Sequence, residues 1–285
     1  ADPAGRGHGG ETDEDPGELG AMDDLGRAFV SFLHQVAVGG MAALLLIPFE
    51  AISRQFFRIA GLILLTVEGL ALWRTGGEGW IQGWSGALFV ALLLAFTVFW
   101  FVPGTPGAMV LHRLGIVAGV FLLVADVLGY PIAGAGPLGI VMGATNALTS
   151  ALLLGTALVG LLLGHRYLNE PHLPVSLIKR LSDVFCMVIL LQGALPALFT
   201  LLVYSFGQSN LVGEWLRLLG EHWALLFGRM IVGIGASLGV ALVILNCLRL
   251  PNVPAATGFY YVAVITVFLG EFLGRYLRAF ASLPF

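Results

Sequence analysis

The sequence predicts an all-α, polytopic transmembrane bundle of about eight helices, and three observations lead to that class. Hydrophobic residues make up 58% of the chain, charged residues only 11%, and the mean hydropathy is +0.92. Soluble domains average about 25% charged residues. From Ala28 to Leu283 the chain consists mostly of apolar runs, each near the roughly 20 residues that cross a hydrocarbon core. Helices satisfy their own backbone in lipid, and the alternating strands of a barrel are absent.

The chain divides into two unequal parts. Residues 1–26 are polar, Gly-rich and acidic, and we expect a flexible N-terminal tail because such a segment buries too little apolar surface to fold alone. A partner-binding arm within a larger complex is the alternative use of this tail. Residues 27–285 are expected to form the eight-helix transmembrane domain.

Charged or helix-breaking residues bound the first four predicted helices. A short turn with Glu50 and Arg54 separates the first from the second, and Trp80 marks the start of the third, because indole rings favour the headgroup level. Pro103 and Pro131 follow the third and fourth helices, where proline interrupts a helical pattern. We place these helices at residues 28–49, 57–74, 80–102 and 109–130.

Prolines also separate the last four helices. Pro137 opens the fifth helix, Pro174 lies in the polar segment before the sixth, and Pro251 divides the seventh from the eighth. Pro196 stands inside the sixth helix, where it favours a bend. We place these helices at residues 137–164, 182–206, 222–248 and 255–280.

The distribution of basic residues predicts the orientation, because cytoplasmic loops carry an excess of Lys and Arg. One set of loops carries most of them, and the internal loops of the other side carry only Arg74 and Arg217. We therefore expect a multi-pass protein of a bacterial inner membrane with both termini on the outer, periplasmic side. The bacterial source is an expectation from the use of Arg, Ala, Gly and Leu. The basic set comprises Arg54, Arg58, Arg113, Arg166, Lys179, Arg180 and Arg249.

Several function classes find no support in the sequence. The two cysteines, Cys186 and Cys247, form no CxxC motif, which argues against an iron–sulfur cluster or a thiolate zinc site in this chain. No nucleotide-binding loop, zinc-protease motif or nucleophile elbow is present. No basic stripe of the kind that binds nucleic acid occurs. The expected partners are the lipid bilayer and other subunits of a membrane complex.

Ionisable residues inside the predicted spans are the first functional candidates, because their insertion into lipid costs roughly 2.5–3.5 kcal/mol each. They are Glu68, Asp126 and Glu271, with Arg229 two turns into the seventh span. Glu271 and Arg275 are spaced i,i+4 on one helical face. In the structural interpretation they form an ion pair whose Arg275 snorkels to the interface. In the functional interpretation Glu271 and Arg275 are the first candidates to contact quinone or relay protons, followed by Glu68 and Asp126.

Histidines fall at matched depths on different helices. His34 and His222 are predicted near the outer face, and His112 and His165 near the inner face. Two histidines that face each other can ligate a b-type haem. They can instead contact a quinone carbonyl, or lie at the interface with an ordinary polar partner.

Weaker polar and small-residue patterns point to helix packing. A stripe in the fifth span and Gln192 in the sixth predict interhelical hydrogen bonds, at roughly 0.6 kcal/mol each; a hydrophilic pocket lining is the alternative. Five Gly-x-x-x-Gly spacings favour close helix contacts. The stripe comprises Thr145, Asn146, Thr149 and Ser150, and the glycine pairs are 115/119, 139/143, 160/164, 235/239 and 270/274.

The end of the eighth span, Gly270-Glu271-Phe272-Leu273-Gly274-Arg275-Tyr276, resembles the membrane subunits of the polysulfide- and dimethylsulfoxide-reductase group, the NrfD-like family. The resemblance extends to eight spans with outside termini. It implies two four-helix bundles, no cofactor of the subunit's own, and a quinone site near one membrane face that serves an iron–sulfur partner. Histidines at both faces depart from that pattern.

The preferred hypothesis is an integral membrane subunit of a respiratory or photosynthetic electron-transfer complex, an oxidoreductase, that interacts with quinone or quinol and, at the histidines, with b-type haem. Two other classes stay open. An ion- or solute-coupled transporter would use Asp126 and Glu68 as coupling sites, although the two halves of the chain show no internal repeat. A non-catalytic scaffold would use its buried charges only to pair with neighbouring subunits.

Overall fold

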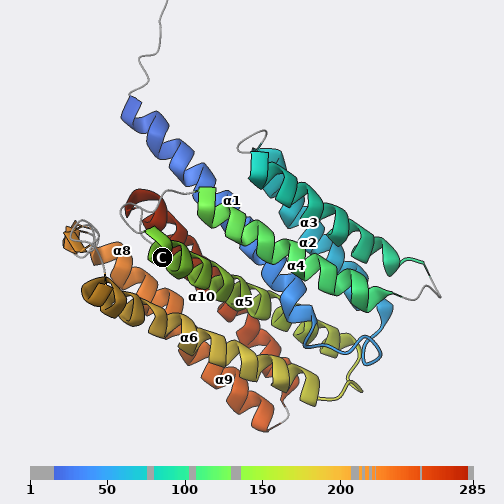
Figure 1. The fold of residues 1–285 in the computed structure, drawn as a ribbon. Coiled ribbons are helices and arrows are strands. Elements are labelled where there is room, and N and C mark those ends of the chain that lie inside the picture. The colour runs from blue at the N-terminus through green and yellow to red at the C-terminus, as the bar shows by residue number, and fades with distance from the viewer. Residues whose placement is uncertain are drawn as a thin grey trace, which may run out of the picture.

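The computed structural model describes residues 16–75, 80–102, 107–129, 136–206, 212–213, 216–217, 220–221, 223–250 and 252–281. These residues form an all-helical bundle (Figure 1). The first fifteen residues of the expected tail and the predicted haem ligand His222 lie outside the described residues.

Eight membrane-length helical segments occur in the described part of the chain. Seven are long and apolar enough to cross a membrane. The eighth, α3, has 20 residues, about 30 Å at a rise of 1.5 Å per residue, and its apolar part is Gly83–Phe99. The elements are α1 (Pro16–Leu44), α2 (Arg54–Thr75), α3 (Trp80–Phe99), α4 (Ala108–Gly129), α5 (Gly136–Asn169), α6 (Ser176–Phe206), α8 (Trp223–Gly228), η1 (Arg229–Ala236), α9 (Ser237–Arg249) and α10 (Val253–Ala281).

The prediction of eight spans in this order is confirmed, and the differences lie at the helix ends. α1 stops at Leu44 rather than residue 49, because Pro48 follows and tight turns replace the helix there. α5 continues to Asn169 and α6 begins at Ser176, so the polar segment expected between them is mostly helical. The polar side chains of these helical extensions, His165, Asn169, Lys179 and Arg180, are exposed.

α1 also begins earlier than expected, at Pro16, so residues 16–26 of the expected tail are helical. Proline is favoured at the first position of a helix, because an N–H group at that position would have no acceptor within the helix and its absence costs nothing.

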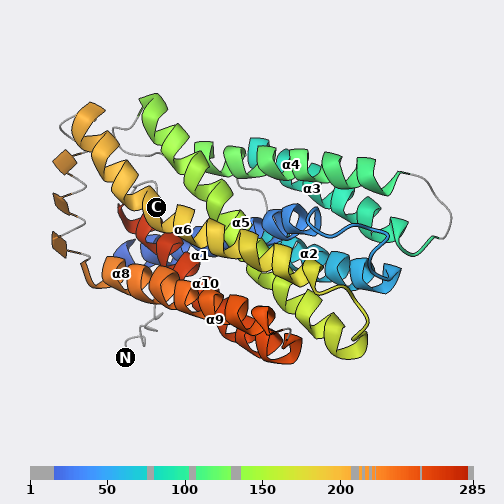
Figure 2. The same ribbon diagram turned by 90° about the horizontal axis from the view of Figure 1, so that it is seen from below.

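The helices form two consecutive four-helix bundles. In the first, α1 contacts α2 and α4, and α3 lies between α2 and α4. In the second, α5 contacts α6 and α10, and α9 lies between α6 and α10. α1 also contacts α5 and α10, so it joins the bundles, as the central blue helix of Figure 1 and the view in Figure 2 show.

The surface of the bundle suits a lipid environment. Large apolar side chains point outward on several helices, among them Val117 on α4, Met187 and Leu201 on α6, and Ile265 on α10. Polar and charged side chains such as Glu68 are buried between the helices instead. The protein is therefore an integral, multi-pass membrane protein. We call the face at which α1 begins and α10 ends the terminal face.

Three of the five predicted glycine pairs meet another helix closely. A Cβ on Gly115 or Gly119 would lie 2.9 Å from Met41 or Val38 of α1. The pair 160/164 packs against Tyr260 and Thr257 of α10, and the pair 270/274 against η1. Among the described glycines, the closest approach to another helix's backbone joins the bundles, where a Cβ on Gly39 would lie 1.7 Å from the Ala151 carbonyl oxygen.

Candidate functional site

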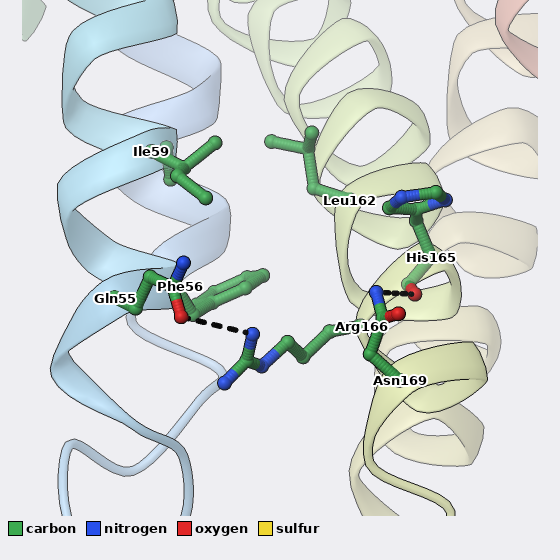
Figure 3. Close-up of a pocket in the computed structure, with 8 residues that line it drawn as sticks. Gln55, Phe56, Ile59, Leu162, His165, Arg166 and Asn169 are labelled. Carbon is green, nitrogen blue, oxygen red and sulfur yellow. Dashed lines mark hydrogen bonds between the residues drawn. The ribbon is translucent and has the colours of Figure 1, made fainter.

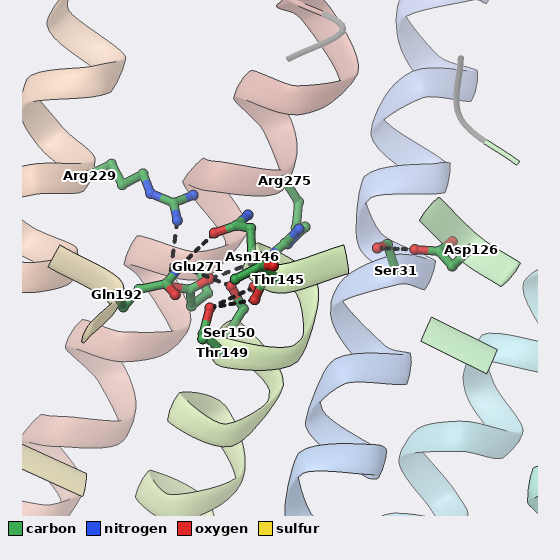
Figure 4. A network of polar contacts seen from close by, with 10 residues as sticks. All are labelled: Ser31, Asp126, Thr145, Asn146, Thr149, Ser150, Gln192, Arg229, Glu271 and Arg275. Atoms are coloured by element: carbon green, nitrogen blue, oxygen red, sulfur yellow. Dashed lines mark hydrogen bonds and ion pairs between the residues drawn. The ribbon is translucent and has the colours of Figure 1, made fainter. Parts of the chain in front are cut away.

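Two clusters of buried polar and charged side chains lie inside the bundle, toward the terminal face. The first cluster is in the first bundle, and its members are Ser31, His34, Gln35, Glu68 and Asp126. The second cluster is in the second bundle, and its members are Asn146, Ser150, Gln192, Arg229, Glu271 and Arg275 (Figure 4).

The centre of the first cluster is a His–carboxylate pair. The Nδ1 atom of His34 on α1 lies 2.8 Å from Oε1 of Glu68 on α2, and Glu68 is completely buried. Deep burial makes the disruption of this pair costly, because removing one partner leaves the other polar group buried without compensation. The sequence predicted both residues as candidates, but it did not predict that they pair with each other.

Gln35 adds a buried amide to the first cluster. Its side chain is fully buried, and neither its nitrogen nor its oxygen has a hydrogen-bond partner among the described residues. Gln35 lies one turn after Ser31, which bonds Asp126 of α4, and one turn before Gly39, which contacts α5. These three residues therefore share one face of α1. The sequence interpretation missed Gln35 and Ser31, although both are polar residues in an apolar run.

Asp126 is the member of the first cluster that also interacts with the second. It accepts a hydrogen bond of 2.6 Å from the Ser31 hydroxyl, which ties α4 to α1. Its carboxylate is close enough to interact electrostatically with His34 in the first cluster and with Arg275 in the second. The two clusters are therefore coupled by charge across the contact between the bundles.

The second cluster places Glu271 between two arginines. Its carboxylate oxygens lie 3.5 Å from a guanidinium nitrogen of Arg275 and 3.8 Å from one of Arg229. Arg275 also donates a hydrogen bond of 2.6 Å to the Ser150 hydroxyl and is only 1% exposed. The predicted pairing of Glu271 with Arg275 is confirmed. The prediction that Arg275 snorkels to the interface is wrong. Its guanidinium points into the bundle, because Ser150 and Glu271 accept its N–H groups there.

Gln192 completes the second cluster from α6. Its amide nitrogen donates hydrogen bonds to Asn146 and Ser150, at 2.9 and 3.0 Å. Pro196 stands one turn later in the same helix and cannot donate a bond to the Gln192 carbonyl. The predicted polar stripe of α5 is therefore divided: Asn146 and Ser150 bond between helices, while the Thr145 and Thr149 hydroxyls bond carbonyls of their own helix.

Arg229 occupies the first position of the π-helix η1. π-Helical turns are rare and frequent at functional sites. Here the helix contacts α10 through glycine: a Cβ on Gly270 would lie 2.1 Å from the Gly233 Cα, and one on Gly274 would lie 1.2 Å from Arg229 Nη1. The Gly-x-x-x-Gly spacing of α10 thus makes room for the Arg229 guanidinium. The sequence analysis did not anticipate a π-helix.

His112 has a structural partner. Its Nε2 atom lies 2.7 Å from the Met41 carbonyl oxygen, and its ring packs against Phe49 and Phe96. α1 ends at Leu44, so the carbonyl oxygens of its last turn need hydrogen-bond donors from outside the helix. Those of residues 42–44 accept N–H groups three residues later, and Met41 accepts the His112 N–H. His112 therefore caps α1.

The structure does not bring His112 and His165 together. His165 lies on α5 at the rim of a hollow between α2 and α5, near the face opposite the terminal face. His34 lies with Glu68 in the first bundle. In the described part of the chain, no group of three or more His, Cys, Asp or Glu side chains has an arrangement that could hold a metal ion.

The fold and the buried clusters define the class of this protein: a polytopic, all-helical membrane protein with charged groups inside its bundle. Comparison with models of known protein families finds no match, and neither does comparison with curated proteins.

Proposed function

We propose that this chain is the membrane subunit of an electron-transfer complex and that its first cluster is a quinol site. The proposal includes the bacterial inner membrane as the location and the outer side as the terminal face. It agrees with the implications of the NrfD-like resemblance, and it moves the preferred site from Glu271 and Arg275 to His34 and Glu68.

The observation that carries the proposal is the buried His34–Glu68 pair with its Gln35 neighbour. Quinol oxidation releases two protons and two electrons, so the site needs a proton acceptor beside the ring hydroxyls that takes the two protons one after the other. The His34 imidazole suits that role because it takes up a proton near neutral pH, and the Glu68 carboxylate at 2.8 Å stabilises the imidazolium that results. The free amide atoms of Gln35 can donate to and accept from ring oxygens.

The second cluster has a supporting role in this proposal. Arg229 and Arg275 hold positive charge in the same half of the membrane, balanced in part by Glu271. Asp126 couples this positive charge electrostatically to His34, since its carboxylate interacts with both His34 and Arg275. In this proposal Asp126, which interacts electrostatically with His34, receives a proton from it and passes it on. The electrons pass to a redox centre of a partner subunit.

The substitution Glu68→Gln tests the proposal in the complex purified from its own membranes. The amide keeps the shape of the side chain but cannot stabilise a charged imidazole, so we expect quinol oxidation to fall at least about 10²-fold, the lower end of general-base contributions. The matched control is Glu50→Gln, at the exposed turn after α1, which should leave turnover unchanged. Wild-type turnover in an assembled Glu68→Gln complex would remove this role, and Glu68-dependent ion uptake without quinol turnover would favour a transporter.

A b-type haem competes for the same histidine. Histidines that ligate a metal often have their other ring nitrogen bonded to a carboxylate, and the Nδ1 bond from His34 to Glu68 has that form. His112 does not fit, because its ring is enclosed by Phe49 and Phe96 and bonded to Met41. A dithionite-reduced absorption spectrum separates the two uses: a haem band that disappears in His34→Gln assigns His34 to iron, and a spectrum without the band leaves it to quinol.

A further inference from the structure

A second, unrelated feature is a hollow between α2 and α5, at the end of the bundle opposite the terminal face (Figure 3). Its volume is about 170 Å³. Its walls toward the membrane centre are apolar, and its outer end is polar. The lining residues are Gln55, Phe56, Ile59, Ala60, Leu162, His165, Arg166 and Asn169.

Arg166 crosses the polar end of this hollow from α5 toward α2 (Figure 3). It bonds the Ser53 hydroxyl at 2.6 Å and reaches the Gln55 side-chain oxygen at only 3.4 Å. Its Nε atom is buried without a hydrogen-bond partner among the described residues. Its ion pair with Glu170 is partly exposed, and such pairs contribute little to stability, so an anion at the hollow can compete for the guanidinium.

The amino-terminal end of α2 adds positive potential at the same place. The first turn of α2, which begins at Arg54, contains no acidic residue, so the positive end of its helix dipole is uncompensated. Backbone N–H groups at such an end bind phosphate readily. Arg54 and Arg58 add charge beside it, although both also donate to carbonyl groups at the end of α3.

We propose that this hollow is a binding site for an anionic phospholipid. The phosphate lies between Arg166 and the start of α2, and one acyl chain lies against Ile59, Ala60 and Leu162. The exposed Ile59 side chain leaves the hollow open toward the bilayer, from which a lipid enters without crossing water. Basic hollows between transmembrane helices are a recognised way to bind anionic headgroups.

Native mass spectrometry of the purified full-length protein tests this proposal. The protein is titrated with phosphatidylglycerol, with phosphatidylcholine of the same acyl chains, and with inorganic phosphate. We expect tighter binding of phosphatidylglycerol than of phosphatidylcholine. Arg166→Gln should weaken phosphatidylglycerol binding about fivefold, the effect of one basic residue near the surface. Arg113→Gln, an exposed arginine of α4 at the same face, should not change it.

Leu162→Trp probes the acyl-chain part of the site. The larger side chain fills the hollow, so both lipids should bind more weakly, with their order of affinity unchanged. Equal binding of the two lipids by the wild-type protein would overturn the proposal, because a neutral ligand would then suffice. Inorganic phosphate that binds the wild type and the Leu162→Trp variant equally, and displaces the lipid from both, would overturn it in favour of a free anion.

Discussion

Individual side chains in this protein are placed by the need to satisfy hydrogen-bonding groups away from water. Arg275 points into the bundle because Ser150 and Glu271 meet it there, and His112 is held by the Met41 carbonyl at the end of α1. An unpaired polar group buried in lipid costs several kcal/mol. Each of these partners therefore decides the direction of a side chain that could otherwise turn toward the membrane surface.

Ser150→Ala tests this argument at one residue. The substitution removes the acceptor of the Arg275 bond at 2.6 Å and of the Gln192 bond at 3.0 Å. We expect a loss of roughly 1–3 kcal/mol, since one of the donors is charged, and a lower midpoint in thermal unfolding of the purified protein. The control is Thr145→Val, whose hydroxyl bonds only the Val141 carbonyl of its own helix. Equal midpoints for the two variants would show that the Ser150 bonds contribute nothing.

At the scale of helices, close approach through glycine determines which elements pack together. η1 reaches α10 because Gly233 and Gly270 bring the two backbones into contact, and Gly274 leaves space for Arg229. A side chain at these positions forces the helices apart or distorts them, and overpacking of this kind typically costs about 1–3 kcal/mol.

Gly270→Ala and Gly258→Ala form a matched pair on α10. The added methyl group at position 270 would lie 2.1 Å from the Gly233 Cα, whereas at position 258 it meets nothing within 4 Å. We expect Gly270→Ala to lower the thermal midpoint by roughly 2–4 °C per kcal/mol lost, and Gly258→Ala to leave it unchanged or raise it slightly, because alanine favours helix. Wild-type stability in Gly270→Ala would contradict the close contact.

Helices of this kind are predictable from sequence to within a few residues, because the length of an apolar run follows the bilayer thickness. Both ends of α4 and the start of α3 agree with the predicted bounds to within one residue, and α3 ends three residues before the predicted end. The π-helix was not, because a change from i→i+4 to i→i+5 bonding leaves no pattern in hydropathy. The pairing of His34 with Glu68 could not be predicted from the sequence either, since it depends on how two separate helices face each other.

At the scale of the whole molecule, two four-helix bundles are joined through α1. At Gly39, which lies against Ala151 and Gly155, the backbones of α1 and α5 approach each other more closely than any other two helix backbones do at a described glycine. This junction lies one turn from Gln35 and next to the polar stripe of α5. The relative position of the bundles therefore sets the distance between the two charged clusters.

Gly155→Ala tests that coupling. Its methyl group would lie 2.0 Å from the Gly39 backbone, so the bundles must separate slightly. We expect lower thermal stability, by about 1–3 kcal/mol, together with reduced quinol turnover in the assembled complex. The control is Gly69→Ala on α2, where nothing lies within 4 Å. A Gly155→Ala complex that is destabilised but turns over normally would show that the two clusters act independently.

The most direct test of the central claim is binding of a fluorescent quinol analogue, a hydroxyquinoline N-oxide, to the purified complex. The account predicts saturable quenching with one site per chain in the wild type and in Glu50→Gln. It predicts at least about tenfold weaker binding in Glu68→Gln and His34→Gln, the effect of losing one charge-assisted hydrogen bond. No saturable binding by the wild type, or identical binding by all four proteins, would contradict a quinol site at His34 and Glu68.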